Sequence, residues 1–409
     1  MKKVIVFHLG SVFDISEDSL EDRTPLEVAS TPHLDHLYSR SFSGSFSVPN
    51  IDDSFLVTHL MSLMFGYKNF QHSSVQLAEG LECELNRNDI VFKNNFVTLK
   101  PTTKSLSIVD PSGSSLSVED KQELTEFLNA NLFKKRDEYF FLKTNSEGDS
   151  VFIYRREKLE KDSVSFKQFK SPYENIGREI DGTPQIKEQS KRFMYIMNES
   201  QMLLSKHPLI TEKSGSDFFF PNSIWLYEGA FVEDQSENEN IVEFKSASVV
   251  SSNLILKGFS KMTGMQFFPW KDFKAKEVFE ENEFVFIDKE YSKYQFDSFE
   301  KVDRIQKLDN EILQLTHLLN KESAKVLFLF NYPYNKNSLG KKGYSFLLTE
   351  IEKGKFYLPR RKFTIFDLLC FISNAISPPE PSCSRFIEKK FNQRRTVNPI
   401  ILRSKVFAS

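Results

Sequence analysis

Short apolar runs constrain the fold of this chain most strongly. They occur at Val4 to Phe7, at Phe284 to Ile287 within the predicted strand Phe284 to Asp288, and at Val326 to Phe330. Runs this short, with apolar residues at consecutive positions, are typical of strands that are buried on both faces. Helical patterns lie between such runs, for example at Phe299 to Leu319. Strands that alternate with helices predict an α/β fold with a doubly wound, mostly parallel sheet.

Further segments are assigned to the same sheet and its helices. The pattern predicts strands at Ser223 to Gly229 and Tyr344 to Glu350. It predicts helices near Val242 to Thr263 and at Thr364 to Ile376. A stronger amphipathic helix is predicted at Asp53 to Tyr67, where apolar residues recur every three or four positions. This helix and the first strand are expected to belong to the same domain.

The segment between them changes character. Strands are predicted at Asp89 to Leu99 and at Ser105 to Asp110, followed by a helix at Ser117 to Leu132 that Ser117 caps. Strands that are grouped with helices in this way indicate an inserted α+β module. The predicted domains are a discontinuous α/β domain of residues 1–75 and 210–409 and an inserted α+β domain of residues 76–209.

Composition narrows the class of protein. The 54 Lys and Arg residues nearly balance the 56 Asp and Glu residues, which gives a formal net charge of −2. A chain with this balance is not an obvious binder of polyanions. The segment Arg385 to Ser409 is basic, and we interpret it as a solvated tail or docking strand. Nucleic acid is not an expected partner.

Cysteine usage and hydropathy indicate the compartment. Cys83, Cys370 and Cys383 are far apart and form no CxxC pair, which fits a reducing environment. The amino-terminal apolar run is short and lacks a small-residue cleavage pattern, so it is interpreted as a strand and not as a signal peptide. No run approaches the roughly 18 apolar residues that cross a membrane. We expect a cytoplasmic protein without a membrane span.

Few reactive side chains follow the predicted strands. His8 follows the first run and is the strongest single candidate, although a lone histidine is more often structural. Ser54 begins a predicted helix and could be a nucleophile or an N-cap. Asp288, Glu290 and Asp297 flank the second run, with Lys289 and Lys293 among them, and this group is interpreted as a solvated charge cluster. A two-metal enzyme would need several Asp and His residues at these strand ends.

A series of motifs adds a family resemblance. In chain order they are TPLEVASTPHLDHL, HLMSLMFGY, NDIVFKNNFVTL, HPL, PNSIWLYEGA, LKGFSKMTGM and ENEFVFIDK. This series resembles the archaeal type of cofactor-independent phosphoglycerate mutase, a glycolytic family in the alkaline phosphatase superfamily. The resemblance implies an alkaline-phosphatase-like sheet with helices on both faces, an inserted α+β domain, and two divalent metal ions such as Mn, Zn or Mg.

The resemblance fails where the family binds metal. The first strand of the family ends in a metal-binding Asp, and this chain has His8 there. The strand Val326 to Phe330 should end in Gly-Asp-His-Ser, and Asn331 and Tyr332 follow it instead. Lys289 and Asp297 persist in the relict cleft, but the Asp and His ligands between them are absent.

The substrate and nucleophile motifs depart as well. The Gly-Ser-Asp nucleophile motif has no clean match, and Ser54 and Thr58 lie in the relict region. The Arg-Ala-Gly-Arg substrate loop of the family corresponds to Pro111–Ser115. The phosphate-binding Arg before Gly-Ala corresponds to Glu228, whose carboxylate would repel a phosphate.

These departures lead to one main hypothesis and one alternative. The main hypothesis is a degenerate, non-catalytic relative of the mutases, a pseudoenzyme that binds or scaffolds an unknown protein or small molecule in the cleft between its domains. No catalytic residue, cofactor-binding residue or metal ligand is assigned, and no cofactor is expected. The alternative is an active phosphoglycerate mutase-type isomerase or a phosphatase-type metalloenzyme with a rebuilt metal site.

Overall fold

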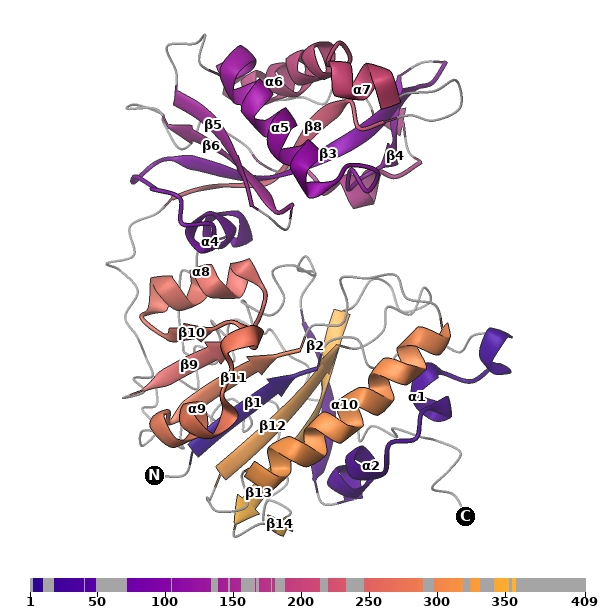
Figure 1. Ribbon diagram of the computed structural model, residues 1–409, viewed down its shortest axis with the longest axis vertical. Helices are drawn as coiled ribbons and strands as arrows, with labels where there is room; N and C mark the ends of the chain where they lie inside the picture. The colour runs from indigo at the N-terminus through magenta and orange to yellow at the C-terminus, as the bar shows by residue number, and fades with distance from the viewer. Residues whose placement is uncertain are drawn as a thin grey trace. The chain divides into compact units, whose positions relative to one another are not determined.

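The computed structural model describes much of the chain and divides it into two units (Figure 1). The described residues are 3–9, 18–39, 41–48, 72–103, 105–133, 139–145, 148–155, 166, 169–177, 179–180, 188–213, 220–232, 246–289, 298–318, 324–331, 342–352 and 355–357. Unit 1 comprises Met1–Phe70, Asn238–Asn253 and Thr263–Ser409, and unit 2 comprises Gln71–Glu237 and Leu254–Met262.

Unit 1 is built on a mixed sheet. Its strands are β1 (Lys3–His8), β2 (Phe42–Val48), β9 (Ala247–Val250), β10 (Gln266–Phe268), β11 (Phe284–Asp288), β12 (Ala324–Asn331), β13 (Lys342–Glu352) and β14 (Lys355–Tyr357). The order is β10-β9-β11-β1-β12-β13-β14, with β2 also paired to β13. The strands from β10 to β12 are parallel, whereas β13, β14 and β2 pair in antiparallel fashion. The predicted α/β class with a mostly parallel sheet is confirmed.

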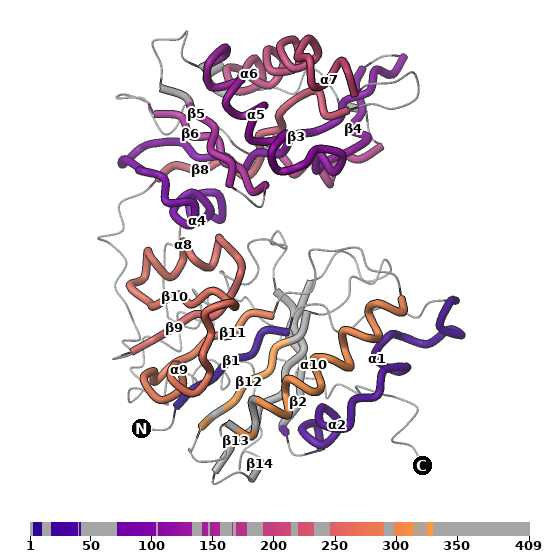
Figure 2. Tube along the Cα trace, viewed as in Figure 1, coloured from indigo at the N-terminus to yellow at the C-terminus, as the bar shows by residue number. Residues whose placement is uncertain are grey.

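Strands from distant parts of the sequence form the centre of this sheet. Figure 2 shows β1, in indigo, between β11 and β12, in orange. Val4 and Ile5 on successive positions of β1 are both buried, so the strand is covered on both faces. The apolar runs of the sequence therefore form buried central strands, as predicted.

Helices pack one face of the sheet in unit 1. They are α1 (Pro25–Val28), α2 (Pro32–Ser39), α9 (Ala275–Glu281) and α10 (Ser298–Leu318). Leu34, Phe279 and Leu308 from these helices join a core that includes Phe7 and Phe328, whose rings stack 4.9 Å apart. Among the helices that the structure describes, none is long and apolar enough to span a membrane.

A carboxylate from α10 caps α2. The Oδ1 atom of Asp309 accepts a hydrogen bond from the backbone N of Leu34 at 2.7 Å, and its Oδ2 atom accepts one from the backbone N of His33 at 3.3 Å. These N–H groups belong to the first turn of α2, where a helix has no partner of its own for them. The residue that caps α2 thus comes from elsewhere in the chain.

Unit 2 is an α+β module. Its strands are β3 (Ile90–Pro101), β4 (Leu106–Asp110), β5 (Tyr139–Thr144), β6 (Ser150–Arg155), β7 (Glu179–Ile180) and β8 (Ser223–Phe231). Its helices include α4 (Ser73–Gly80), α5 (Val118–Leu128), α6 (Glu188–Leu204), α7 (Pro208–Lys213) and α8 (Leu254–Thr263). The sheet order is β5-β6-β3-β4-β7, and β8 also pairs with β3.

Different helices pack against the two faces of this sheet (Figure 1). Phe92 of β3 packs with Leu124 of α5 and Phe193 of α6. Val91, the preceding residue, packs on the other face with Val75 of α4 and Ile255 of α8. Neighbouring residues of β3 therefore point to opposite layers, as the pleat of a strand requires.

Several predicted boundaries differ from the structure. Ser223–Gly229 is a strand, but it pairs with β3 and so lies in unit 2, which extends beyond the expected limit of residue 209. The helix expected near Val242 to Thr263 is the strand β9 followed by α8, because the small apolar run Ala247–Val250 pairs with β11. The helices predicted at 53–67 and 364–376 lie outside the described residues.

Candidate functional site

The carboxyl ends of adjacent parallel strands bring polar side chains together in unit 1. His8 ends β1 and Asp288 ends β11, and the two residues are register partners. Ser251 directly follows β9, whose Val250 pairs with Ile287. Binding sites of open α/β sheets form at this edge. The site therefore lies where the topology of the sheet predicts one.

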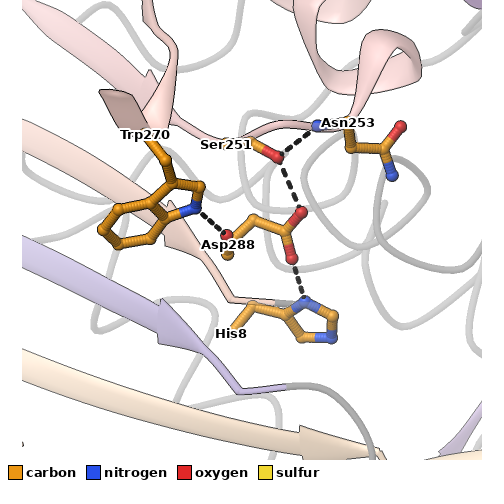
Figure 3. A network of polar contacts seen from close by, with 5 residues as sticks. All are labelled: His8, Ser251, Asn253, Trp270 and Asp288. Atoms are coloured by element: carbon orange, nitrogen blue, oxygen red, sulfur yellow. Dashed lines mark hydrogen bonds and ion pairs between the residues drawn. The ribbon is translucent and has the colours of Figure 1, made fainter. Parts of the chain in front are cut away.

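Hydrogen bonds join these side chains to one another and to Asn253 and Trp270 (Figure 3). We call these five residues the His8 network. The Nδ1 atom of His8 lies 2.7 Å from Oδ1 of Asp288, and the hydroxyl of Ser251 donates to Oδ2 of Asp288 at 2.8 Å. The backbone N of Asn253 donates to Oγ of Ser251 at 2.9 Å, and the indole N–H of Trp270 donates to the Asp288 carbonyl oxygen at 3.0 Å. Each oxygen of the Asp288 carboxylate thus has a partner.

The side chains at the centre of the His8 network, those of His8, Ser251 and Asp288, are buried. The exposed fraction of His8 is 0% and that of Asp288 is 2%. A buried carboxylate is tolerated when hydrogen bonds replace its lost hydration. An Nδ1–H bond to a carboxylate places the proton on Nδ1 and orients the imidazole, as in histidines that act through Nε2 as a base or a metal ligand.

Sequence reasoning identified only part of this network. His8 is at the predicted place, but the interpretation of Asp288 as part of a solvated charge cluster is wrong. Asp288 is paired with a residue 280 positions away, and no local pattern signals that contact. The signal available was the position of each residue at the end of an apolar run.

Lys289 is held beside the network by two contacts. Its ammonium lies 4.0 Å from the centre of the Trp270 ring, a cation–π contact. Its Nζ atom also lies 2.7 Å from Oε2 of Glu311 on α10. Lys289 therefore links β11 to α10 and fixes the indole that binds the Asp288 carbonyl.

The other predicted site residues are not brought together within the described part of the chain. Ser54, Thr58, Asp297 and Tyr332 lie outside it. Asn331 is the last residue of β12 and pairs with Tyr344 of β13. Over the described ranges, no group of three or more His, Cys, Asp or Glu residues is placed to hold a metal ion. The donors of the His8 network alone do not make up a two-metal site.

A second polar cluster lies in unit 2. The Nζ atom of Lys93 on β3 lies 2.7 Å from Oε2 of Glu228 on β8. The hydroxyl of Ser73, the first residue of α4, donates to the same carboxylate oxygen. The exposed fraction of Lys93 is 4%, so its charge is balanced inside the protein. The sequence singled out Glu228 but gave no sign of its partners.

Comparisons with known proteins converge on one family. The profile described as 2,3-bisphosphoglycerate-independent phosphoglycerate mutase matches residues 58–209. A Geobacter sulfurreducens protein named "Probable 2,3-bisphosphoglycerate-independent phosphoglycerate mutase" is 27% identical over 230 residues, 55% of each chain. The Methanothermobacter thermautotrophicus protein named 2,3-bisphosphoglycerate-independent phosphoglycerate mutase 1 is 25% identical over 272 residues, 65% of this chain and 64% of that one.

The sequence match to these relatives covers only part of each chain, whereas the structural match covers most of the chain. The chain spans less than two thirds of the length of both relatives. The solved structure of the PH0037 protein from Pyrococcus horikoshii superposes with a TM-score of 0.56 at 17% identity. It covers 87% of this chain and 91% of that chain, so the two proteins share a fold.

Proposed function

The chain is related to the 2,3-bisphosphoglycerate-independent phosphoglycerate mutases, and from that premise we propose that it is a degenerate, non-catalytic member with a binding or scaffolding role. Its partner in that role would be a protein or a small molecule. The observation that carries the proposal is the ion pair of Glu228 with Lys93, at a position where the family resemblance implies a phosphate-binding arginine.

The relationship corrects one expectation. We expected no cofactor, but the chain is related to a family that uses divalent metal ions, so that expectation is wrong. His8 and Asp288 carry suitable donor atoms, yet within the described residues no third ligand completes a set. The proposal therefore rests on the residues at the phosphate-binding position and not on metal binding.

The charge of Glu228 opposes the family reaction. A phosphate group brought to this position would meet a carboxylate instead of a guanidinium, and two like charges a few ångströms apart repel. Lys93 cannot replace the arginine while it pairs with Glu228 at 2.7 Å. The loss of phosphate binding would remove the interactions that position the substrate for transfer.

The His8 network supports a structural role for the other unit. His8 stands where the family resemblance implies a metal-binding Asp. It is bonded to a carboxylate that Ser251 also contacts. A buried network with paired members stabilises the strand ends that it joins. The network thus preserves the sheet while it alters the chemistry at its edge.

A cytoplasmic location belongs to the same proposal. It rests on the three dispersed cysteines of the sequence. Fractionation of the source cells, followed by detection of the protein in a cytoplasmic or another fraction, tests it.

A turnover assay tests the proposed function. The purified full chain is incubated with 3-phosphoglycerate and added Mn²⁺, and formation of 2-phosphoglycerate is followed by ³¹P NMR. The Methanothermobacter relative serves as the positive control, and the metal content of both proteins is measured. We expect no turnover by the chain, whatever its metal content. Turnover at a rate comparable with that of the relative would refute the proposal and favour an active metalloenzyme.

A further inference from the structure

The backbone of β8 is irregular at Glu228. Val91 of β3 pairs with Ala230, but Lys93 pairs with Tyr227. Glu228 and Gly229 together therefore stand opposite Phe92, which is the pattern of a β-bulge. Glu228 has a φ angle of +49°, in the left-handed region that a glutamate adopts only at a cost in free energy.

The bulge changes the face to which β8 directs its side chains. Leu226 packs in the cluster of Phe92, whereas Ala230 packs in the cluster of Val91 on the opposite face. Regular alternation would place residues 226, 228 and 230 on one face. The bulge instead carries Glu228 to the face of Lys93. Gly229 completes it, because a side chain there would overlap the Phe92 ring.

The surroundings of the Glu228 carboxylate are those of an anion-binding site. It lies at the amino end of the eight-residue helix α4, where Ser73 donates its hydroxyl and Lys93 supplies a buried positive charge. The next hydroxyl, Ser74 Oγ, is buried and has no hydrogen-bond partner in the part of the chain that the structure describes. An ammonium, hydroxyls and a helix amino end are the groups that bind small oxyanions in proteins.

We propose that Glu228 is an internal ligand. Its carboxylate fills an oxyanion site formed by Lys93, Ser73 and the amino end of α4, and the site takes a free oxyanion such as phosphate when that carboxylate is removed. This proposal extends the proposed function. It rests on one part of that function, namely that the Glu228 carboxylate prevents phosphate from binding at this position. The strained backbone at Glu228 is the observation that a simple surface ion pair would not require.

The buried Lys93 gives the reason why an oxyanion would bind in place of the Glu228 carboxylate. Lys93 is almost fully buried, and a buried ammonium is unstable without a counter-charge. Removal of Glu228 takes away the carboxylate that lies 2.7 Å from the Lys93 ammonium. A small anion from solution supplies a counter-charge without backbone strain.

Two variants open the site. Glu228→Gln removes the charge and keeps the shape, and Glu228→Gly also relieves the left-handed backbone. Glu82→Gly is a matched control, because Glu82 has a φ angle of +58° and pairs with Lys257 at 2.7 Å but is 71% exposed. The probe is inorganic phosphate, with acetate as a second arm that distinguishes a carboxylate from a phosphate preference. Both are titrated against the melting temperature and by calorimetry, at ionic strength matched with chloride.

We expect the wild-type chain and Glu82→Gly to show no saturable response to either anion. Both Glu228 variants should gain saturable binding, and Lys93→Met added to Glu228→Gln should weaken it at least about tenfold. A response to acetate alone would support the site and assign it to carboxylates. Equal phosphate binding by all proteins, or no binding by a Glu228 variant with native circular dichroism, would overturn the proposal. Neither result depends on turnover, so failure of the proposed function is seen separately.

Discussion

His8 at the end of β1 and Asp288 at the end of β11 share a hydrogen bond of 2.7 Å between buried side chains. This bond ties two neighbouring strands of the central sheet at the edge where open α/β sheets hold their sites. Because Ser251 and Trp270 also bond to Asp288, one residue holds together β1, β11 and the segments that follow β9 and β10.

Asp288→Ala should therefore destabilise unit 1 strongly. The change leaves the Nδ1–H of His8 and the hydroxyl of Ser251 without the carboxylate, so we expect a loss of about 3 kcal/mol in the free energy of unfolding. Urea-induced unfolding measures it. Asp272→Asn is the control, because Asp272 is exposed, and it should change stability by less than about 0.5 kcal/mol. Similar effects of the two changes would contradict the role of Asp288.

Gly258→Ala should destabilise unit 2 even though alanine favours helices. Gly258 of α8 lies so close to α4 that a Cβ atom would overlap the carbonyl oxygen of Gln76. The helices must move apart, and we expect a net loss of about 2 kcal/mol, because overlap with backbone exceeds the gain in helix propensity. Lys261→Ala on the same helix removes an ion pair between the exposed Lys261 and the partly buried Glu79 and should cost less than about 1 kcal/mol. The melting temperatures of both variants test this prediction, and equal melting temperatures would contradict it.

Asp309→Ala should loosen α2. The substitution removes the acceptor for the backbone N–H groups of His33 and Leu34, and we expect a loss of about 1 to 2 kcal/mol. Amide hydrogen exchange should become faster in α2 than elsewhere in unit 1. Asp303→Ala is the control from the same helix, since Asp303 is exposed and pairs along α10 with Lys307. Faster exchange in α2 for both variants would contradict a specific cap.

Cys83 should react slowly with thiol reagents. Burial raises the pKa of the Cys83 thiol from 9.0 to about 11, so the reactive thiolate is scarce near neutral pH. In a variant with Cys370→Ser and Cys383→Ser, we expect alkylation at pH 8 to be much slower in the native protein than in urea. The unfolded thiol ionises first, so this group should lower stability as pH rises from about 9 to about 11. Equal alkylation rates would show that Cys83 is accessible.

Local patterns in the sequence predict some strands correctly, whereas other strands depend on partners that are distant in the chain. The apolar runs at Val4, Phe284 and Val326 predicted central strands, and β1, β11 and β12 cover them. The pattern at Ala247–Val250 predicts helix, because small and apolar residues fit either structure until a neighbouring strand is present. Likewise, the residues of β8 were recognised as a strand but assigned to the wrong sheet, since a strand pattern does not name its partner.

The sequence by itself determined that the apolar runs at Val4, Phe284 and Val326 are strands, and it marked His8 and Glu228 as departures from the family pattern. Only the tertiary structure decided what these residues contact. His8 meets Asp288 because parallel pairing aligns the ends of β1 and β11, and Glu228 meets Lys93 because a bulge turns β8. Hydrophobic periodicity depends on near neighbours in the chain, whereas these contacts depend on strand register between segments more than a hundred residues apart.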